Sequence, residues 1–246
     1  MKAKIETAVI LAAGLGSRLG EIKGDKPKAF IKVGDQSLIE RSIQLLLSKG
    51  IQSVIIGTGY LSEEFDALIG KYPQVKTRKN TDYATTGSMY TLYLIREQIK
   101  GPFLLLEGDL LYESAVLDEV MDDPRENIIL ASDATESGDE VFIETREVGL
   151  LNRMSKQKSE LKRVAGELVG ISKLTSSTLK LMSHFAEASY NANDDSIHYE
   201  DAMVGVAQQV ELNVKVVNDM AWCEIDDASH LERAVNYVYP KILERS

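Results

Sequence analysis

Residues 9–20 read Val-Ile-Leu-Ala-Ala-Gly-Leu-Gly-Ser-Arg-Leu-Gly and are followed by Asp-Lys-Pro-Lys at 25–28. The apolar beginning of this segment predicts a buried strand over Thr7–Ala13. Gly14 and Gly16 allow a tight turn in which backbone N–H groups approach an anion closely. Arg18 and Lys28 add fixed positive charge beside that turn. The segment therefore predicts a strand that ends in a binding loop for a polyphosphate, as carried by a nucleoside triphosphate.

The spacing of these glycines excludes two other phosphate-binding motifs. A P-loop ends in Gly-Lys-Ser/Thr, which this loop lacks. The dinucleotide-binding fingerprint keeps three glycines at a different spacing, with an acidic residue about 20 positions further on. The pattern that remains is Leu-Ala-Ala-Gly-x-Gly-x-Arg-Leu with Lys-Pro-Lys downstream.

The composition is that of a compact enzyme. With 246 residues, 44% of them hydrophobic, the chain can bury one substantial core, and we expect a single domain over residues 1–246. The formal net charge of −10 argues against nucleic-acid and anionic-membrane partners, which require a basic face. Cys223 is alone and cannot form an internal disulfide. With no signal-peptide pattern and no apolar run of membrane-spanning length, the chain is expected to be cytoplasmic.

Apolar runs alternate with longer amphipathic stretches, which predicts an α/β fold with a doubly wound, mostly parallel, Rossmann-like sheet. Ligands of such sheets bind beyond the carboxyl ends of the strands. The expected strands are Thr7–Ala13, Ser53–Thr58, Phe103–Glu107 and Ile128–Ser132. The expected helices are Leu38–Lys49, Ser62–Lys71, Ser88–Ile99 with Ser88 as its N-cap, and Ser114–Met121.

The pattern changes between about Asp139 and Lys173, where short runs have period-two character. These runs predict a hairpin-rich lobe within the domain. Its expected strands are Val141–Ile143, Val148–Leu151, Leu161–Val164 and Leu168–Ile171. Beyond it, helices are expected over Thr175–Ala188, His198–Gln209 and Leu231–Leu243, the last one interrupted or ended near Pro240.

The chain resembles the sugar-nucleotide and cytidylyl transferases of the nucleotidyltransferase superfamily, whose folds are GT-A-like. The glycine loop with its downstream lysine is joined by Glu107-Gly108-Asp109 and by Trp222-Cys223-Glu224-Ile225-Asp226, where the superfamily keeps its metal carboxylates. These enzymes couple a nucleoside triphosphate to a phosphorylated small molecule and release pyrophosphate. The resemblance covers nearly the whole chain, so it implies a nucleotidyltransferase with Mg²⁺ as cofactor.

The resemblance assigns roles to charged residues along the chain. Asp109, Asp226 and Glu224 are the expected metal ligands, since hard oxygen donors suit Mg²⁺. Glu107 is left out of this set, because it is expected to be a plain carboxylate at the strand end. Lys28 is assigned to the α-phosphate and its transition-state charge, with Arg18 as the second catalytic cation and Lys26 beside it on the outer phosphates. No catalytic histidine is expected, because the acceptor oxygen is already ionised.

The nucleotide is expected to lie against backbone and small residues at the strand ends. A pocket of this kind suits cytosine, which is too small to fill a purine site, so CTP is the favoured nucleotide. Ser88 has the alternative role of a plain helix cap. The expected nucleotide-binding residues are Leu11, Ala12, Ala13, Gly14, Gly16, Ser17, Lys26, Gly59, Tyr60, Asn80, Thr86, Gly87 and Ser88.

Two families of relatives stand out for the acceptor, the phosphocholine and the 2-aminoethylphosphonate cytidylyltransferases. A trimethylammonium group is held by aromatic faces, whereas a primary ammonium prefers carboxylates. Where phosphocholine enzymes carry a tryptophan before a phenylalanine, this chain has Val141-Phe142. The lobe over residues 139–173 is the expected acceptor lobe. The expected acceptor-binding residues are Asp133, Asp139, Glu140, Tyr199, Glu200 and Asp201.

The favoured function is thus Mg²⁺-dependent transfer of CMP from CTP to 2-aminoethylphosphonate, for phosphonate modification of lipids or glycans. Phosphocholine and sugar-1-phosphate transfer are the alternatives within the superfamily. A non-catalytic nucleotide sensor is the alternative of another class, although such proteins usually lose the residues that Lys28, Asp109 and Asp226 represent. The partners are CTP and a small phosphonate or phosphate acceptor. Homo-oligomer formation and fusion to another phosphonate-pathway enzyme stay open.

Overall fold

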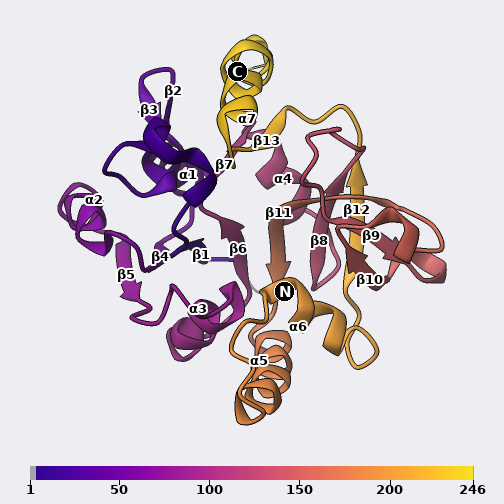
Figure 1. The fold of residues 1–246 in the computed structure, drawn as a ribbon. Coiled ribbons are helices and arrows are strands. Elements are labelled where there is room, and N and C mark those ends of the chain that lie inside the picture. Colours follow the sequence, from indigo (N-terminus) through magenta and orange to yellow (C-terminus); the bar gives the residue numbers. More distant parts are fainter. Residues whose placement is uncertain (1–3, 246) are drawn as a thin grey trace.

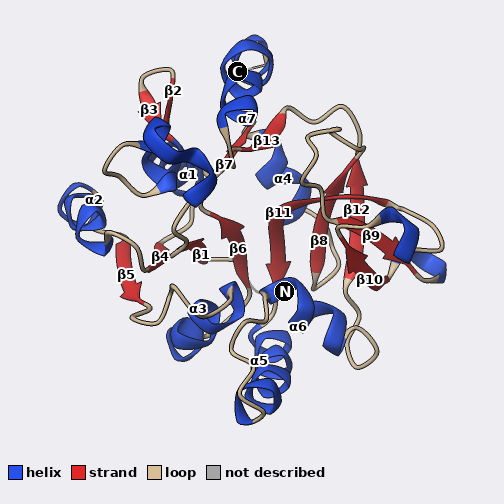
Figure 2. Cartoon of the chain, viewed as in Figure 1, coloured by secondary structure: helices blue, strands red, loops and turns tan. Residues whose placement is uncertain are grey.

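The computed structural model describes residues 4–245 and has the expected α/β fold. Within these residues a nine-stranded sheet runs through the molecule, with helices on both faces (Figures 1 and 2). No helix among them is long and apolar enough to cross a membrane. The strands of this sheet are β1 (Thr7–Ala12), β4 (Ser53–Thr58), β5 (Val75–Lys79), β6 (Phe103–Glu107), β8 (Ile128–Ser132), β9 (Phe142–Thr145), β10 (Leu151–Ser155), β11 (Gly166–Leu174) and β12 (Asn213–Val217).

The sheet has two sides that meet between β6 and β11 (Figure 1). On the first side β6, β1, β4 and β5 are parallel neighbours in that order. On the second side β11 is antiparallel to β6, β8 and β9, while β12 is parallel to β8. The register of β1, with Ala12 opposite Thr58 and Leu11 opposite Glu107, brings the carboxyl ends of three strands to one edge.

Alternate strand residues bury opposite faces of the sheet, as the two-residue period requires. Ile10 packs in a cluster with α1 and α4, whereas Val9 packs in another with α3, α5 and α6. Both residues are fully buried. The helices are α1 (Leu38–Ser48), α2 (Asp66–Lys71), α3 (Ser88–Ile95), α4 (Ala115–Met121), α5 (Ser176–Asn191), α6 (Tyr199–Val206), α7 (Ala228–Arg233) and α8 (Tyr239–Glu244).

The hairpin-rich lobe is present, but two of its expected strands are wrong. Residues 147–149 form a 3-10 turn in which Gly149 has a φ of +76°, so β10 starts only at Leu151. Leu161–Val164 is not a strand, since the Glu144 carboxylate accepts the Lys162 backbone N–H that a ladder would need. The lobe is built instead from the antiparallel β9–β10 hairpin on the end of β11.

One helix end differs from expectation, and the C-terminal helix is interrupted near Pro240, which was one of the two expected alternatives. Gly87, not Ser88, occupies the N-cap of α3, and Ser88 is its first helical residue. Pro240 does not end the C-terminal helix, because it sits in the first turn of α8, where its missing N–H is tolerated. A π-helical turn over Ala234–Val238 precedes it.

Two small sheets complete the fold. One pairs β2 (Lys32–Val33) with β3 (Gln36–Ser37), and the other pairs β7 (Leu110–Tyr112) with β13 (Trp222–Glu224). The second of these joins segments that are far apart in the sequence at the ligand edge of the large sheet.

Candidate active site

The glycine loop after β1 forms the floor of a cavity of about 270 Å³, here called the glycine-loop cavity. A side chain at Gly14 would project into open space, so the backbone there is accessible to a ligand. Gly16 has a φ of +59°, and a Cβ atom on it would lie 3.1 Å from the Cβ of Lys28. The turn therefore needs glycine at 16 both for its backbone and for the close passage of Lys28. The cavity is lined by Leu11, Ala12, Gly14, Leu15, Gly16, Ser17, Arg18, Lys28, Ala29, Gly108, Asp109 and Asp226.

Asp109 and Asp226 are brought together by backbone pairing. The Gly108 N–H donates to the Leu11 carbonyl at 2.9 Å, which holds the end of β6 against β1 and places Asp109 beside the glycine loop. The β7–β13 ladder then aligns Glu224 with Leu110, and the Ile225 N–H donates to the Asp109 carbonyl. Two carboxylates that are 117 positions apart in the sequence, at 109 and 226, thereby share one site.

The Lys28 ammonium lies in the middle of these carboxylates. Its Nζ is 2.5 Å from Asp109 Oδ2 and 3.7 Å from Glu224 Oε1, and it also contacts Asp226 Oδ1. Arg18 approaches from the other side, with a guanidinium nitrogen 2.8 Å from Asp226 Oδ1. A single lysine thus contacts every carboxylate that the sequence assigned to the metal.

Burial and neighbouring charges together raise the pKa values of Lys28 and Glu224 and leave the pKa of Asp226 below its usual value. Desolvation lowers the pKa of Lys28, but the charges of Asp109, Glu224 and Asp226 outweigh it, so the pKa is raised and the ammonium stays charged. Desolvation and the neighbouring Asp109 raise the pKa of Glu224. Desolvation also acts on Asp226, yet hydrogen bonding to Glu224 and the charge of Lys28 hold its pKa low. The cluster has more acids than one lysine can neutralise.

The oxygens of this cluster fit a divalent cation. Ligand atoms of Glu107, Asp109 and Glu224 lie within 4.8 Å of one another. Asp109 Oδ1 and Asp226 Oδ2 are buried without a hydrogen-bond partner among residues 4–245, which leaves two carboxylate oxygens for a cation. All the donors are hard oxygens, the kind that Mg²⁺ prefers.

Glu107, which was left out of the expected metal ligands, lies beside this group. Its side chain lies over Gly170 of β11, which has a φ of +76° and where an added Cβ would be 2.5 Å from Glu107 Oε2. The Tyr199 hydroxyl donates to Glu107 Oε1 at 2.7 Å. Desolvation and the Asp109 charge raise the pKa of Glu107 to about 8. Glu107 and Asp109 are two positions apart at the end of β6, so strand alternation favours the same side for both.

A central cavity of about 380 Å³ extends from the glycine loop toward α3. The Ser88 hydroxyl accepts the Tyr199 N–H at 3.0 Å, and the Ser88 N–H donates to His198 Nδ1, so the first turns of α3 and α6 are tied together. Gly87 allows this approach, since a Cβ there would lie 2.0 Å from the Ile197 carbonyl oxygen. Of the expected nucleotide-binding residues, this cavity is lined by Leu11, Ala13, Gly14, Thr86, Gly87 and Ser88.

Other residues that were expected to contact the nucleotide instead support residues around the central cavity. Asn80 is buried and donates to the hydroxyls of Thr86 and Thr91, which orders the turn before α3. Gly59 lets Tyr83 pack close, because a Cβ on Gly59 would be 2.5 Å from the Tyr83 Cβ. The Tyr60 N–H donates to the Ala13 carbonyl, and its ring meets Tyr83 edge-on. Tyr83 itself lines the central cavity.

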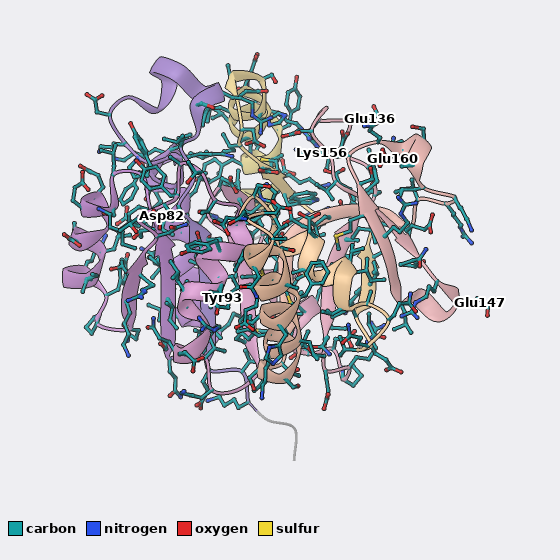
Figure 3. The ribbon with its side chains drawn as sticks, turned by 60° about the horizontal axis from the view of Figure 1, so that its bottom comes forward. Asp82, Tyr93, Glu136, Glu147, Lys156 and Glu160 are labelled. Atoms are coloured by element: carbon teal, nitrogen blue, oxygen red, sulfur yellow. The ribbon has the colours of Figure 1, made fainter. Side chains whose placement is uncertain are left out.

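A third cavity of about 160 Å³, the lobe cavity, is lined by Arg18 and by residues of the lobe over 139–173. Asp139 bridges two cations there, at 2.6 Å from Arg18 and 2.5 Å from Lys156. In Figure 3, Lys156 lies toward the middle of the molecule, whereas Glu147 marks the outer end of the lobe. Glu140 and Glu200 also line this cavity.

The lobe cavity continues into an outer cavity of about 400 Å³ beside α5 and α6. Glu200 lines the central, lobe and outer cavities, and its Oε2 is buried without a hydrogen-bond partner in the described part of the chain. Desolvation raises its pKa. Asp201 lines the outer cavity but is engaged in capping, since it accepts the His198 N–H at 2.8 Å. The outer cavity is lined by Val141, Met154, Ser155, Lys156, Phe185, His198, Glu200, Asp201, Val204 and Gly205.

Two expected site residues do not join these cavities. Asp133 is exposed, and its carboxylate accepts the Asp219 N–H at 3.3 Å in the loop after β12. Lys26 is exposed and is not among the described residues that line the four cavities.

Several cavity-lining residues were missed from the sequence, including two basic and two aromatic side chains. His198, Lys156, Phe185 and Tyr83 come from an N-cap, a strand end, a helix and a turn, with no shared spacing. The acidic run before His198 was the only signal near any of them. His230 of α7 makes hydrogen bonds within the fold. Its Nδ1 accepts the Asp226 N–H, and Nε2 lies 3.1 Å from the Ser137 carbonyl.

The sequence is similar to those of several known proteins. Residues 8–171 match the MobA-like NTP transferase domain. The choline-phosphate cytidylyltransferase of Streptococcus pneumoniae is 40% identical over 107 residues, which are 44% of this chain and 46% of that protein. The chain thus matches less than half the length of that relative. The 2-aminoethylphosphonate cytidylyltransferase of Lancefieldella rimae is 25% identical over 229 residues, 91% of this chain and 89% of that protein.

Solved structures support the fold. The inositol-1-phosphate CTP transferase from T. maritima superposes with a TM-score of 0.81 at 18% identity, covering 99% of this chain and 98% of that one. The CTP:phosphocholine cytidylyltransferase from Streptococcus pneumoniae has a TM-score of 0.79 at 24% identity, covering 94% and 97%. Since the family match spans the glycine loop, Lys28 and Asp109, the chain belongs to the MobA-like NTP transferase domain family and is a nucleotidyltransferase.

Proposed function

We propose that this protein transfers CMP from CTP to 2-aminoethylphosphonate in a Mg²⁺-dependent reaction that releases pyrophosphate. The proposal places the whole site in one domain over residues 1–246. The product would be an activated head group for attaching a phosphonate to lipids or glycans. Similarity to the 2-aminoethylphosphonate cytidylyltransferase of Lancefieldella rimae over 91% of the chain supports this choice.

The charge arrangement of the lobe cavity is the observation that carries the proposal. On one side of this cavity, Arg18 and Lys156 each form an ion pair with Asp139. On the same cavity, Glu200 presents a buried carboxylate with an oxygen that no described residue contacts by a hydrogen bond. An acceptor with a phosphonate at one end and an ammonium at the other matches these charges, because a primary ammonium can donate to that oxygen of Glu200.

In this proposal the chain's own groups hold the nucleotide and position the reacting atoms. The backbone of the glycine loop binds the outer phosphates, and Arg18 lies beside them. Lys28 binds the α-phosphate and stabilises the charge that builds on it. A divalent cation bound by Asp109, Asp226 and Glu224 would neutralise phosphate charge and help orient the triphosphate.

The chemical step needs no protein nucleophile or base. An ionised phosphonate oxygen of the acceptor attacks the α-phosphorus, and the bond between that phosphorus and the bridging oxygen of pyrophosphate breaks. The electron pair leaves with pyrophosphate, so charge and atoms balance. What the site supplies is an in-line arrangement and cationic charge, as in other phosphoryl transfers.

The nucleobase is proposed to lie in the central cavity. There Gly87 and Ser88 begin α3, and main-chain groups can meet the edge of a small base. The close approach of Ile197 to Gly87 narrows this end of the cavity. A pyrimidine therefore suits it better than a purine.

Phosphocholine is the second candidate acceptor, because the outer cavity contains an aromatic ring. Phe185 lines it together with Met154, Val204 and the carboxylates Glu200 and Asp201. A trimethylammonium group is held by such aromatic and apolar surfaces near negative charge. The 40% identity with a choline-phosphate cytidylyltransferase over 107 residues supports this alternative.

The test is steady-state kinetics with CTP, Mg²⁺ and three acceptors, scored by pyrophosphate release. We expect kcat/KM to fall from 2-aminoethylphosphonate to phosphoethanolamine to phosphocholine. Each N-methyl group removes a donor, and leaving a buried carboxylate unsatisfied costs about 1–3 kcal/mol. That corresponds to roughly one to two powers of ten in rate. Phosphocholine as the preferred acceptor would reject the first candidate in favour of the second.

A further inference from the structure

The Lys28 ammonium lies where three carboxylates converge. Its Nζ contacts Asp109 Oδ2, Asp226 Oδ1 and Glu224 Oε1, and the side chain is only 13% exposed. Hard cations bind in the same way, with several carboxylate oxygens around one positive centre. The lysine is therefore a local substitute for a metal ion.

These contacts involve the same carboxylates that are proposed to bind the divalent cation. An oxygen that accepts from an ammonium at 2.5 Å, as Asp109 Oδ2 does, has one of its two lone-pair sites occupied, so a metal ion on the other site would lie close to the ammonium. Asp109 Oδ1 and Asp226 Oδ2 have no hydrogen-bond partner among the described residues, but a cation on them would lie within a few ångströms of Nζ. The positive charges of the Lys28 ammonium and of the cation would repel each other strongly at this buried site.

The side chain of Lys28 has room for a second position of its ammonium, nearer the glycine loop. Its stem passes along Gly16 of the glycine loop, where an added Cβ would lie 3.1 Å from the Lys28 Cβ. Rotation about the outer bonds of the flexible stem moves Nζ toward the loop while the backbone stays in place. A triphosphate held on the loop would supply new anionic partners for the ammonium.

We propose that Lys28 competes with the divalent cation for the carboxylates of Asp109 and Asp226, and that a triphosphate relieves this competition by drawing the ammonium to its own oxygens. The inference rests on the proposed function, since it takes the triphosphate as the second partner of Lys28. It makes Lys28 a positioning residue for the metal in addition to its proposed contact with the α-phosphate. Metal and nucleotide then bind cooperatively, because each favours the same position of one side chain.

The experiment is a Mn²⁺ titration followed by electron paramagnetic resonance, with no acceptor present. Wild type, Lys28→Met and Lys26→Met are compared, without nucleotide and with a saturating α,β-methylene analogue of CTP. Lys26 is the matched control, because it is an exposed lysine of the same loop and is not among the described residues that line the glycine-loop cavity. Lys28→Gln is the second variant, and circular dichroism checks that each protein is folded.

Without nucleotide, we expect Lys28→Met and Lys28→Gln to bind Mn²⁺ about tenfold or more tightly than wild type, since a nearby positive charge is gone. Lys26→Met should match wild type. The analogue should strengthen Mn²⁺ binding more in wild type than in the Lys28 variants. Equal or weaker Mn²⁺ binding by the folded variants, or the same nucleotide enhancement in all proteins, overturns the competition.

Failure of this inference can be told from failure of the proposed function. The Mn²⁺ titration needs neither acceptor nor turnover, so it reports the competition even if the acceptor is different. Conversely, an inactive wild type in the three-acceptor assay rejects the proposed reaction while leaving the titration readable.

Discussion

The two sides of the sheet prepare their ligand surfaces differently. On the first side, around β1 and β6, the glycine loop, Arg18 and Lys28 come from one segment of the chain, residues 11–28. On the second side, around β9 to β11 and α6, it consists of side chains such as Lys156, Phe185 and Glu200, which come from separate elements. A phosphate site built from main chain is therefore local in sequence, whereas a site that selects a small acceptor is assembled by packing.

The two sides of the sheet also differ in the interactions that stabilise them. The first is a run of parallel strands with fully buried residues such as Ile10 and Ile56. The second carries buried polar groups with their partners, such as Glu144, which accepts from Asn152 and from the Lys162 backbone. Substitutions on the two sides should therefore affect different measurements.

The strongest loss of activity should follow Lys28→Ala. Turnover should fall about 10²–10³-fold, because a charge that acts mainly in the transition state is removed. The KM for CTP should change only a few-fold. Steady-state pyrophosphate release measures both values, with Lys26→Ala as the control that should behave like wild type. Wild-type turnover by Lys28→Ala would show that its role is wrongly assigned.

Asp226→Asn comes next and tests the far end of the same site. The substitution removes a negative charge that contacts Lys28 and Arg18. Activity should fall about 100-fold, or recover only at much higher Mg²⁺ concentration. Mg²⁺ titration of the activity measures this. Asp227→Asn is the neighbouring control, because Asp227 caps α7 and asparagine also caps well. The same Mg²⁺ requirement in both variants would count against a metal role for Asp226.

Glu200→Gln should separate the second side from the first. Loss of the charge should weaken binding of the aminoethylphosphonate acceptor, so that the acceptor KM rises about 10- to 100-fold while the KM for CTP stays near its wild-type value. Asp133→Asn is the control, since Asp133 was expected at the acceptor but lies away from the cavities. An equal rise in KM for both substrates would indicate that Glu200 supports the fold and does not recognise the acceptor.

The mildest change should follow Asp123→Asn, in the segment between α4 and β8. The Arg125 guanidinium donates to Asp123 at 2.9 and 2.7 Å, and these hydrogen bonds hold the pKa of Asp123 well below its usual range. Because the folded-state pKa is depressed, the stability that it contributes is present above about pH 4 and is lost as the pH falls toward the folded-state value. The substitution should cost about 1–2 kcal/mol near pH 7.

Urea unfolding of wild type and Asp123→Asn at several pH values measures this difference. The gap in the free energy of unfolding should be constant near pH 7 and shrink below about pH 4, with kcat unchanged. A gap that grows on acidification would contradict the assigned cause.

Local sequence was enough to predict the first strand with its glycine loop and downstream lysine, and three further strands of the large sheet. Ser53–Thr58, Phe103–Glu107 and Ile128–Ser132 are strands over the predicted residues. Their continuous apolar runs have no other way to be buried, and Gly16 is needed for a turn with positive φ. Such features depend on interactions between near neighbours in the chain, so the neighbouring residues suffice to predict them.

Which side chains share a cavity depends instead on how the elements pack in three dimensions. Gly170 of β11 leaves the room that the Glu107 side chain occupies beside Asp109, and the β7–β13 ladder brings Asp226 to the same site. Packing also moved Asp133 to the Asp219 loop, although its position after β8 pointed to the site. The physical reason is that a side chain's direction at a strand end depends on the turn that follows and on what packs against it, neither of which is encoded by spacing along one segment.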